Sequence, residues 1–311
     1  MASGFLGQRV AGAAPVYNVA RQDAKMRNAQ GNCTDGQYVY QCLVKEVGGA
    51  AEEVEIQKIR LRDWKRVLTV ATQRNPAFEG YGLYHGADLC YNPQLGQIVA
   101  IAFSNYERPQ HSLIYLDPET LLPVGKRKVS GVAQFFTIDY EPVSQRYVAT
   151  RTGAGGVRNF VVFDSQFNKL AEFPIAPAKK TTATVCDETY IYCLENDPAY
   201  GSFARSQLHV FGWDGAYVKS VKIASPGEIE DLFIKNGYFY IAYNTLEIVN
   251  GRVKNGGRAD PMTLRKVTPS ISAMLSNPPA FFRSGRLAEW YMERMVSYTS
   301  RAEATFVKWF G

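Results

Sequence analysis

Asn32-Cys-Thr-Asp-Gly-Gln-Tyr-Val-Tyr40 joins a short strand, an acidic glycine turn and a second strand of aromatic and β-branched residues. Four later segments repeat this order, with a turn rich in Asp, Asn, Gly or Pro between the two strands. They span residues 88–100, 136–149, 184–192 and 232–241. Hairpins that recur at intervals of about 40–50 residues are typical of β-propeller blades. The repeat therefore predicts an all-β fold, a five-bladed β-propeller.

Outer strands follow four of the five hairpins, because apolar residues alternate with polar ones between further turn signals. We expect them at 54–61, 66–70, 112–116, 159–164, 170–175, 207–211 and 217–223. The fifth blade departs from this pattern. Its strands at 230–234 and 238–243 are followed by a predicted glycine-rich basic loop at 250–261 and an outer strand at 264–267.

Three regions follow from this pattern. Residues 1–28 are an N-terminal arm with one strand near 16–19, which could also supply a strand that closes the ring. Residues 29–250 are the propeller. Residues 251–311 are a basic C-terminal segment with helical spacing at 270–275 and 285–309.

The net charge of +6 comes from the C-terminal segment, since residues 252–311 contain 10 Lys and Arg against 4 Asp and Glu. A basic segment on a neutral body indicates contact with something acidic. A solvated tail with a chance surplus of arginines is the alternative. Within this segment we expect a helix that either packs on the propeller or docks a partner. Its predicted partner-binding residues are Arg286, Trp290, Tyr291, Arg294 and Tyr298.

The five cysteines occupy similar places in the repeats, which indicates small buried side chains. Cross-strand bridges between Cys33 and Cys42 or between Cys186 and Cys193 are left open. No CxxC motif is present and the chain has only 3 His, so we expect no metal site and no cofactor. The chain shows neither a signal peptide at its start nor an apolar run long enough to span a membrane.

One face of a propeller carries the connections from second to third strands and from fourth to first strands. Here these connections are long and contain aromatic and arginine side chains, which stack on sugars, anchor proteins or pair with oxyanions. The alternative is that the aromatics pack their own loops. The predicted ligand-binding residues are Tyr81, Tyr84, Tyr106, Arg108, Arg158, Tyr200, Phe203 and Arg205.

Carboxylates gather where the central channel should open. A propeller glycosidase would use two of them roughly 5–10 Å apart, and the candidates are Asp88, Glu230 and Asp231. They come from the second and fifth blades only, so we predict no catalytic residues and keep the hydrolase as an alternative. The histidines His85, His111 and His209 are few and spread along the chain, so the sequence indicates no Ser/His/Asp arrangement.

Two segments carry a family resemblance. They read His85-Gly-Ala-Asp-Leu-Cys-Tyr-Asn-Pro-Gln-Leu-Gly-Gln-Ile98 and Ala29-Gln-Gly-Asn-Cys-Thr-Asp-Gly-Gln-Tyr-Val-Tyr40. Over about residues 29–245 the chain resembles five-bladed propellers of bacteriophage tail and receptor-binding proteins and of related bacterial wall-associated proteins. It departs from them in its basic helical C-terminus and in lacking a long trimeric stalk.

The resemblance implies a non-enzymatic virion protein of a tail or tail fibre, made in the host cytoplasm, that serves in adhesion or as a structural adaptor. Its implied partners are other virion proteins, through the C-terminal segment, and a host-surface glycan. Nucleic acid is not expected as a partner, and a homo-oligomer is left open. The remaining alternatives are the glycan-active hydrolase and a bacterial scaffold propeller that binds peptides.

Overall fold

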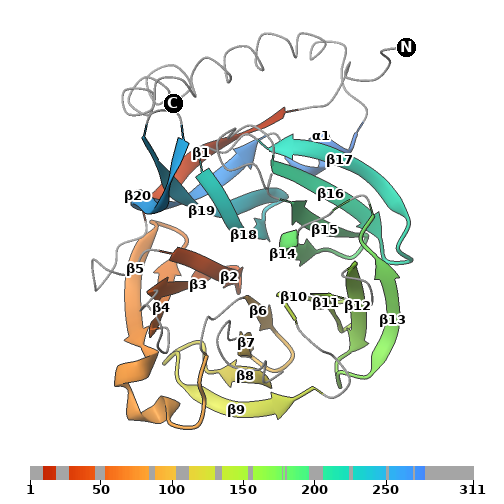
Figure 1. The fold of residues 1–311 in the computed structure, drawn as a ribbon. Coiled ribbons are helices and arrows are strands. Elements are labelled where there is room, and N and C mark those ends of the chain that lie inside the picture. Colours follow the sequence, from red (N-terminus) through yellow and green to blue (C-terminus); the bar gives the residue numbers. More distant parts are fainter. Residues whose placement is uncertain are drawn as a thin grey trace, which may run out of the picture.

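Five antiparallel blades surround a common axis in the computed structural model of this chain (Figure 1). The structure describes residues 10–18, 28–45, 53–83, 88–102, 112–129, 135–152, 157–176, 178, 181–195, 206–223, 227–249, 252–268 and 270–276. The predicted all-β, five-bladed propeller is confirmed. Strands β2, β6, β10, β14 and β18 face the centre of the ring.

The first three blades are sheets of four consecutive strands. Blade one contains β2 (Asn28–Thr34), β3 (Tyr38–Lys45), β4 (Glu53–Arg60) and β5 (Lys65–Ala71). Blade two contains β6 (Leu89–Asn92), β7 (Gln97–Ala102), β8 (Ser112–Leu116) and β9 (Pro123–Lys128). Blade three contains β10 (Thr137–Glu141), β11 (Arg146–Thr152), β12 (Arg158–Asp164) and β13 (Lys169–Pro174).

Blades four and five are joined in one eight-stranded sheet. Blade four contains β14 (Thr181–Cys186), β15 (Tyr190–Glu195), β16 (Ser206–Gly212) and β17 (Tyr217–Ile223). Blade five contains β18 (Gly227–Lys235), β19 (Tyr238–Val249), β20 (Arg252–Thr268) and β1 (Val10–Asn18). Two short 3-10 turns, η1 (Thr72–Arg74) and η2 (Pro76–Phe78), follow blade one.

The repeated turn owes its sequence to one acidic side chain. In blade one, Asp35 accepts hydrogen bonds from two turn amides, one of them that of Tyr38 at 2.7 Å, and from the Tyr40 hydroxyl at 2.7 Å. Blade four repeats the arrangement, with Asp187 accepting from the Tyr192 hydroxyl at 2.5 Å. Asx turns of this kind supply the backbone with local acceptors and favour hairpins. This explains why an acidic turn precedes an aromatic strand.

The N-terminal arm closes the ring. Strand β1 runs antiparallel to β20 as the outermost strand of blade five, and Val10 and Ala11 also pair in parallel with β17 of blade four. The strand spans Val10–Asn18, where the sequence indicated 16–19. Figure 1 shows the red β1 beside the blue β20. Closure by a strand from the other end of the chain removes an exposed sheet edge.

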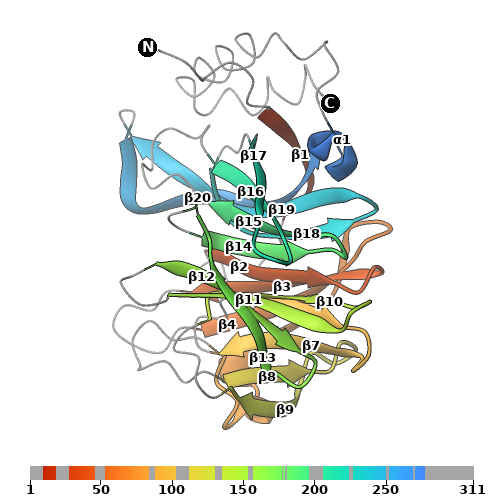
Figure 2. The same ribbon diagram turned by 90° about the vertical axis from the view of Figure 1, so that its right-hand side faces the viewer.

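Blade five extends past the predicted propeller boundary at residue 250. The segment 250–261 was expected to be a glycine-rich loop, but residues from Arg252 onward belong to β20, which pairs with β19 as far as Val249 and Arg252. The pairings of β18 end at Thr245 and those of β1 at Thr263, so the far end of this hairpin extends beyond both neighbours (Figure 2). In the sequence of 250–261, glycines and charged residues interrupt the alternation of apolar and polar residues that would indicate a strand.

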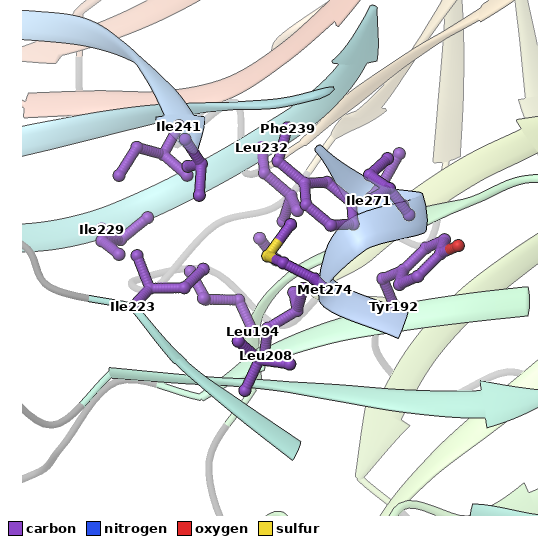
Figure 3. Packing of buried hydrophobic residues seen from close by; sticks show 14 of the residues in the cluster. Tyr192, Leu194, Leu208, Ile223, Ile229, Leu232, Phe239, Ile241, Ile271 and Met274 are labelled. Atoms are coloured by element: carbon purple, nitrogen blue, oxygen red, sulfur yellow. The ribbon is translucent and has the colours of Figure 1, made fainter. Parts of the chain in front are cut away.

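Apolar layers between adjacent blades form the core. In the layer between blades four and five, Met274 points in among Leu232, Phe239 and Tyr192 (Figure 3). Met274 comes from α1 (Ile271–Leu275), a short helix capped by the Ser270 hydroxyl. This confirms the helical spacing predicted at 270–275. The second predicted helix, 285–309, lies outside the described residues.

All five cysteines are buried and free, which confirms the expected small buried side chains and leaves neither of the two bridges formed. Among the described residues, no helix is long and apolar enough to cross a membrane.

Candidate functional site: the axis and the loop face

Two aspartates at the axis tie neighbouring blades together. Asp88 of blade two accepts the Ile138 amide of blade three at 2.8 Å and its own neighbour's amide, that of Leu89, at 2.7 Å. Asp231 of blade five accepts the Asn32 amide of blade one. Asp88 and Asp231 occupy the same place in their blades. Each is 2% exposed, so both act as buried acceptors for the next blade's backbone.

The two carboxyl groups also hydrogen-bond to each other. Burial raises the pKa of Asp88 well above its ordinary value, and burial with the charge of Asp88 raises the pKa of Asp231 likewise. Both oxygens of Asp88 already accept amides, so Asp88 is the ionised partner and Asp231 holds the shared proton. Two carboxylates this close cannot both ionise cheaply. The pair is therefore a carboxyl–carboxylate hydrogen bond.

Asp139 makes a third link between blades. Its carboxylate accepts the Cys186 amide of blade four at 2.7 Å and the Cys186 thiol at 3.4 Å. Burial raises the pKa of Asp139 to about 6, although the bond from the Cys186 amide opposes the shift. Asp139 was not among the residues predicted from the sequence. Its place in the first strand of a blade, like that of Asp231, is the signal that could have found it.

Gly31 lets blade one approach blade two at the axis. A Cβ atom on Gly31 would lie 2.4 Å from the Asp88 Cα and 2.7 Å from the Leu89 nitrogen, both of them backbone atoms. The strand β2 has a bulge between Ala29 and Asn32, and β18 has one next to Asp231. Bulges redirect side chains at such points. The glycine and the two bulges together allow the Asp88–Asp231 contact.

Glu230, the third carboxylate of the hydrolase alternative, is half-buried beside that bulge. The other two carboxyl groups, those of Asp88 and Asp231, accept hydrogen bonds from backbone amides at the axis. In the part of the chain that the structure describes, no group of three or more His, Cys, Asp and Glu side chains is placed to hold a metal ion.

The loop face is where strands β3, β7, β11 and β15 end and β12 and β16 begin (Figure 2). Of the residues predicted to bind ligand there, the structure describes Tyr81 and Arg158. Tyr81 follows η2, its amide bonds the Phe78 carbonyl at 2.8 Å, and its ring packs against the core between blades one and two. The predicted residues outside the described part are Tyr84, Tyr106, Arg108, Tyr200, Phe203, Arg205, Arg286, Trp290, Tyr291, Arg294 and Tyr298.

Arg158 opens strand β12 at this face. Its guanidinium carbon lies 3.6 Å from the centre of the Phe136 ring. The Nη1 atom is buried and has no hydrogen-bond partner among the described residues, and burial lowers the pKa of the guanidinium. A cation stacked on an aromatic ring is held in place by the ring quadrupole. Arg158 is thus a fixed, partly desolvated cation at the predicted binding face.

Arg151, on the adjacent strand β11, differs from Arg158 in that its charge is paired with a carboxylate. Its guanidinium bonds Glu172 at 2.5 Å, and Asn159 also donates to that carboxylate. The bond from Arg151, aided by Asn159, lowers the pKa of Glu172 to about 2. The charge of Arg151 is therefore neutralised within blade three.

A Ser–His–Glu chain in blade four escaped the sequence analysis. His209 lies with Nδ1 2.7 Å from the Ser220 hydroxyl and with Nε2 2.8 Å from the Glu195 carboxylate. The Ser220 oxygen also lies 2.7 Å from the Tyr217 hydroxyl. Residues 209 and 220 face each other across β16 and β17, so strand register creates the contact. The imidazole is buried and bonded at both nitrogens, as expected of a structural polar network.

No protein-family model matches this sequence, and no curated protein matches it. Similar solved structures include a tail fibre of Staphylococcus aureus phage P68, at TM-score 0.55 and 10% identity, covering 82% of this chain and 52% of that one. This chain thus spans about half the length of that tail fibre.

Two glycoside-cleaving enzymes have a similar fold. The catalytic domain of the Coprinopsis cinerea GH62 α-L-arabinofuranosidase matches at TM-score 0.52 and 9% identity, covering 84% of this chain and 96% of that one. The α-L-arabinofuranosidase PaAbf62A from Podospora anserina matches at 0.51 and 8%, covering 85% and 98%. At such identities the likeness establishes the propeller fold alone, and the chemistry has to be argued from this chain's own residues.

Proposed function

We propose that this chain is a non-enzymatic component of a phage tail or tail fibre, which binds a host-surface glycan or a neighbouring subunit through its loop face. The main support for this proposal is the way in which two carboxyl groups are bonded at the axis of the propeller. Asp88 and Asp231 are buried, bonded to each other and occupied by backbone amides of other blades. A glycosidase needs two carboxyl groups that reach a substrate, and these two serve the fold.

The loop face supports a binding role. Arg158 lies there as a stacked, partly desolvated cation, and the sequence predicts long connections with aromatic residues on the same face. The likeness to a phage tail fibre supports the virion setting. The likeness to arabinofuranosidases keeps the hydrolase as the competing proposal.

Attachment to the particle through the basic C-terminal segment is part of this proposal. Its test must spare β20 (Arg252–Thr268), because removal of residues 252–311 would take out a strand of blade five. A deletion of residues 277–311 leaves every described strand and α1 in place.

The experiment supplies the full chain or residues 1–276 to phage particles that lack the protein, then measures the chain in purified particles by immunoblot. We expect the full chain to be incorporated and the shortened chain to be absent from particles while retaining the circular dichroism of the full chain. Equal incorporation of both would refute the attachment role. Failure of the full chain to enter any particle would refute the virion role.

A second experiment decides between binding and hydrolysis. The purified chain is incubated with host-cell polysaccharide, and released sugars are measured by chromatography beside an Asp231→Asn variant, which keeps an oxygen for the Asn32 amide. We expect no release by either protein, and binding of the full chain to the polysaccharide. Release by the unaltered chain that disappears in the variant would establish the hydrolase.

A further inference from the structure

We infer that Arg158 is the anion-binding centre of the loop face, and that the saccharide bound there carries a carboxylate or phosphate group. This inference rests on the proposed binding function of that face and names the chemical class of its ligand.

The first support is the unmet hydrogen-bonding capacity of Arg158. A guanidinium has five N–H donors in a fixed planar fork. The buried Nη1 of Arg158 finds no acceptor among the described residues. Leaving a charged donor desolvated and unpaired costs more free energy than leaving a neutral one. An oxyanion neutralises such a partly desolvated cation best, because two of its oxygens match the guanidinium fork.

The second support is orientation. The Phe136 ring lies against the face of the guanidinium, with 3.6 Å from the guanidinium carbon to the ring centre. All five N–H bonds lie in the guanidinium plane. A group stacked on that face leaves the donors free to point sideways. Phe136 thus fixes the cation without using any of its hydrogen bonds, which lowers the entropy lost when a ligand binds.

The third support is the contrast with other described arginines. Arg60 bonds Asp63 at 2.7 Å, Arg127 bonds the Gln166 carbonyl, and Arg151 bonds Glu172. Arg146 also stacks on a ring and has a buried unpaired nitrogen, but it lies 3.9 Å from the Glu141 carboxylate. For Arg158 the only described group that acts on the pKa besides burial is the Cys193 thiol. No carboxylate of the described residues compensates its charge in this way. The uncompensated cation lies on the face where the sequence places the long connections.

The position sets the expected strength. Arg158 is half-buried, at the boundary between solvent and the interior of blade three. A charge-assisted hydrogen bond gains strength from the low dielectric on one side, while the ligand still approaches from water. We therefore expect Arg158 to govern both affinity and the preference for charged over neutral saccharides.

The test measures binding by isothermal titration calorimetry with the full chain. The probes are tri-galacturonate as the carboxylate saccharide, glucose 6-phosphate as the phosphate saccharide, inorganic phosphate as the bare anion, and galactotriose as the neutral saccharide. The variants are Arg158→Gln, Arg158→Lys and Arg62→Gln. Arg62 is an exposed arginine in the turn between β4 and β5, on the opposite face, so its variant removes the same charge without touching the site.

We expect a charged saccharide to bind at least about tenfold more tightly than galactotriose, and Arg158→Gln to lose at least about tenfold of that affinity. Arg158→Lys should recover only part, because an ammonium lacks the fork. Arg62→Gln should bind like the unaltered chain. The stronger of tri-galacturonate and glucose 6-phosphate identifies the oxyanion. Binding of inorganic phosphate alone would overturn the saccharide part of the inference.

Equal binding by Arg158→Gln and the unaltered chain would overturn the inference, as would tighter binding of the neutral probe. Neither result touches the proposed function, which is measured separately as binding of the fluorescently labelled chain to host cells. If Arg158→Gln binds cells as well as the unaltered chain does, the proposed function stands and the anion site is refuted. A chain that binds the charged probe through Arg158 but no cells retains the site and loses the proposed function.

Discussion

Asp231 hydrogen-bonds to Asp88, although one belongs to the fifth blade and the other to the second. Blade one lies between them in the ring, and its residue at the crossing point is Gly31. Burial raises the pKa of both carboxyl groups. A single proton therefore links the last blade of the propeller to the early ones.

Because Asp231 holds the shared proton, we expect substitution of Asp88 and substitution of Asp231 to affect stability differently. Asp231→Asn keeps an N–H donor toward Asp88 and an oxygen for the Asn32 amide. Asp88→Asn loses one acceptor, so either the Ile138 or the Leu89 amide is left unpaired, at a cost of about 1–3 kcal/mol. We expect chemical denaturation at pH 7 to show Asp88→Asn clearly less stable than the unaltered chain and Asp231→Asn at least as stable. Equal loss in both would contradict the proton assignment.

The same pair predicts how stability depends on pH. The pKa of Asp231 is raised in the folded protein. The stability that Asp231 contributes is complete below its pKa in the unfolded chain, about 3.9. This stability is lost as the pH rises toward the pKa of Asp231 in the folded protein. Asp139, with a folded pKa of about 6, acts in the same direction. We expect the melting temperature of Asp231→Asn, relative to that of the unaltered chain, to increase as the pH rises from 4 to 8. A constant difference would disprove the linkage.

Gly31 should tolerate no side chain. In Gly31→Ala the new Cβ would lie 2.4 Å from the backbone of Asp88, so the inner strands of blades one and two must separate. We expect a loss of about 3 kcal/mol or more in the free energy of unfolding, or no folded protein. Gly125→Ala is the matched control, because the nearest atoms to its Cβ would belong to the Tyr115 side chain, at an ordinary contact distance of 3.5 Å. The two variants should differ widely in urea denaturation.

The repeated turn predicts equal effects at equivalent places. Tyr40→Phe and Tyr192→Phe each remove a hydroxyl that bonds an acidic turn residue, Asp35 or Asp187. Each should lower stability by about 1 kcal/mol. Tyr38→Phe, on the same strand as Tyr40 and only half-buried, serves as the control with little change. A large effect at one repeat and none at the other would show that the turns are not equivalent.

Ring closure predicts a specific consequence of truncation. Deleting residues 1–18 removes β1, so β20 keeps its pairing with β19 but loses that with β1 and becomes the exposed outer strand of blade five. Hydrogen exchange should then speed up in residues 263–268 and leave β10–β13 of blade three unchanged. Exposed edges also promote association, so size-exclusion chromatography should show higher oligomers. Unchanged exchange in 263–268 would mean that β1 contributes no protection.

Much of the fold was predictable from local chemistry. The acidic turn with its aromatic strand recurs because each hairpin needs its own acceptor and its own core ring, as Asp35 with Tyr40 and Asp187 with Tyr192 show. The strand at 112–116 was placed correctly because its flanks carry clear turn signals. The hairpin of β19 and β20 was missed because glycines and charges in 250–261 imitate a loop, while pairing across the ribbon decides its structure.

The site was less accessible to sequence reasoning. Arg158 was predicted on the loop face because loop position follows from strand order, yet its stacking on Phe136 and its unpaired nitrogen depend on packing. The contact of Ser220 with His209 arises from register between two strands. Such contacts leave no spacing pattern along the chain.

The sequence by itself determined the number of blades, the hairpins and the face on which the long connections lie, because turn chemistry and strand alternation act between residues close together in the chain. The tertiary structure alone decided the pairing of β1 with β20, the proton shared by Asp88 and Asp231, and the stacking of Arg158. The first two join groups far apart in the chain that meet only when the ring closes, and the third joins Phe136, next to the first strand of blade three, to the third strand of that blade. Their energies depend on burial, which local sequence does not encode.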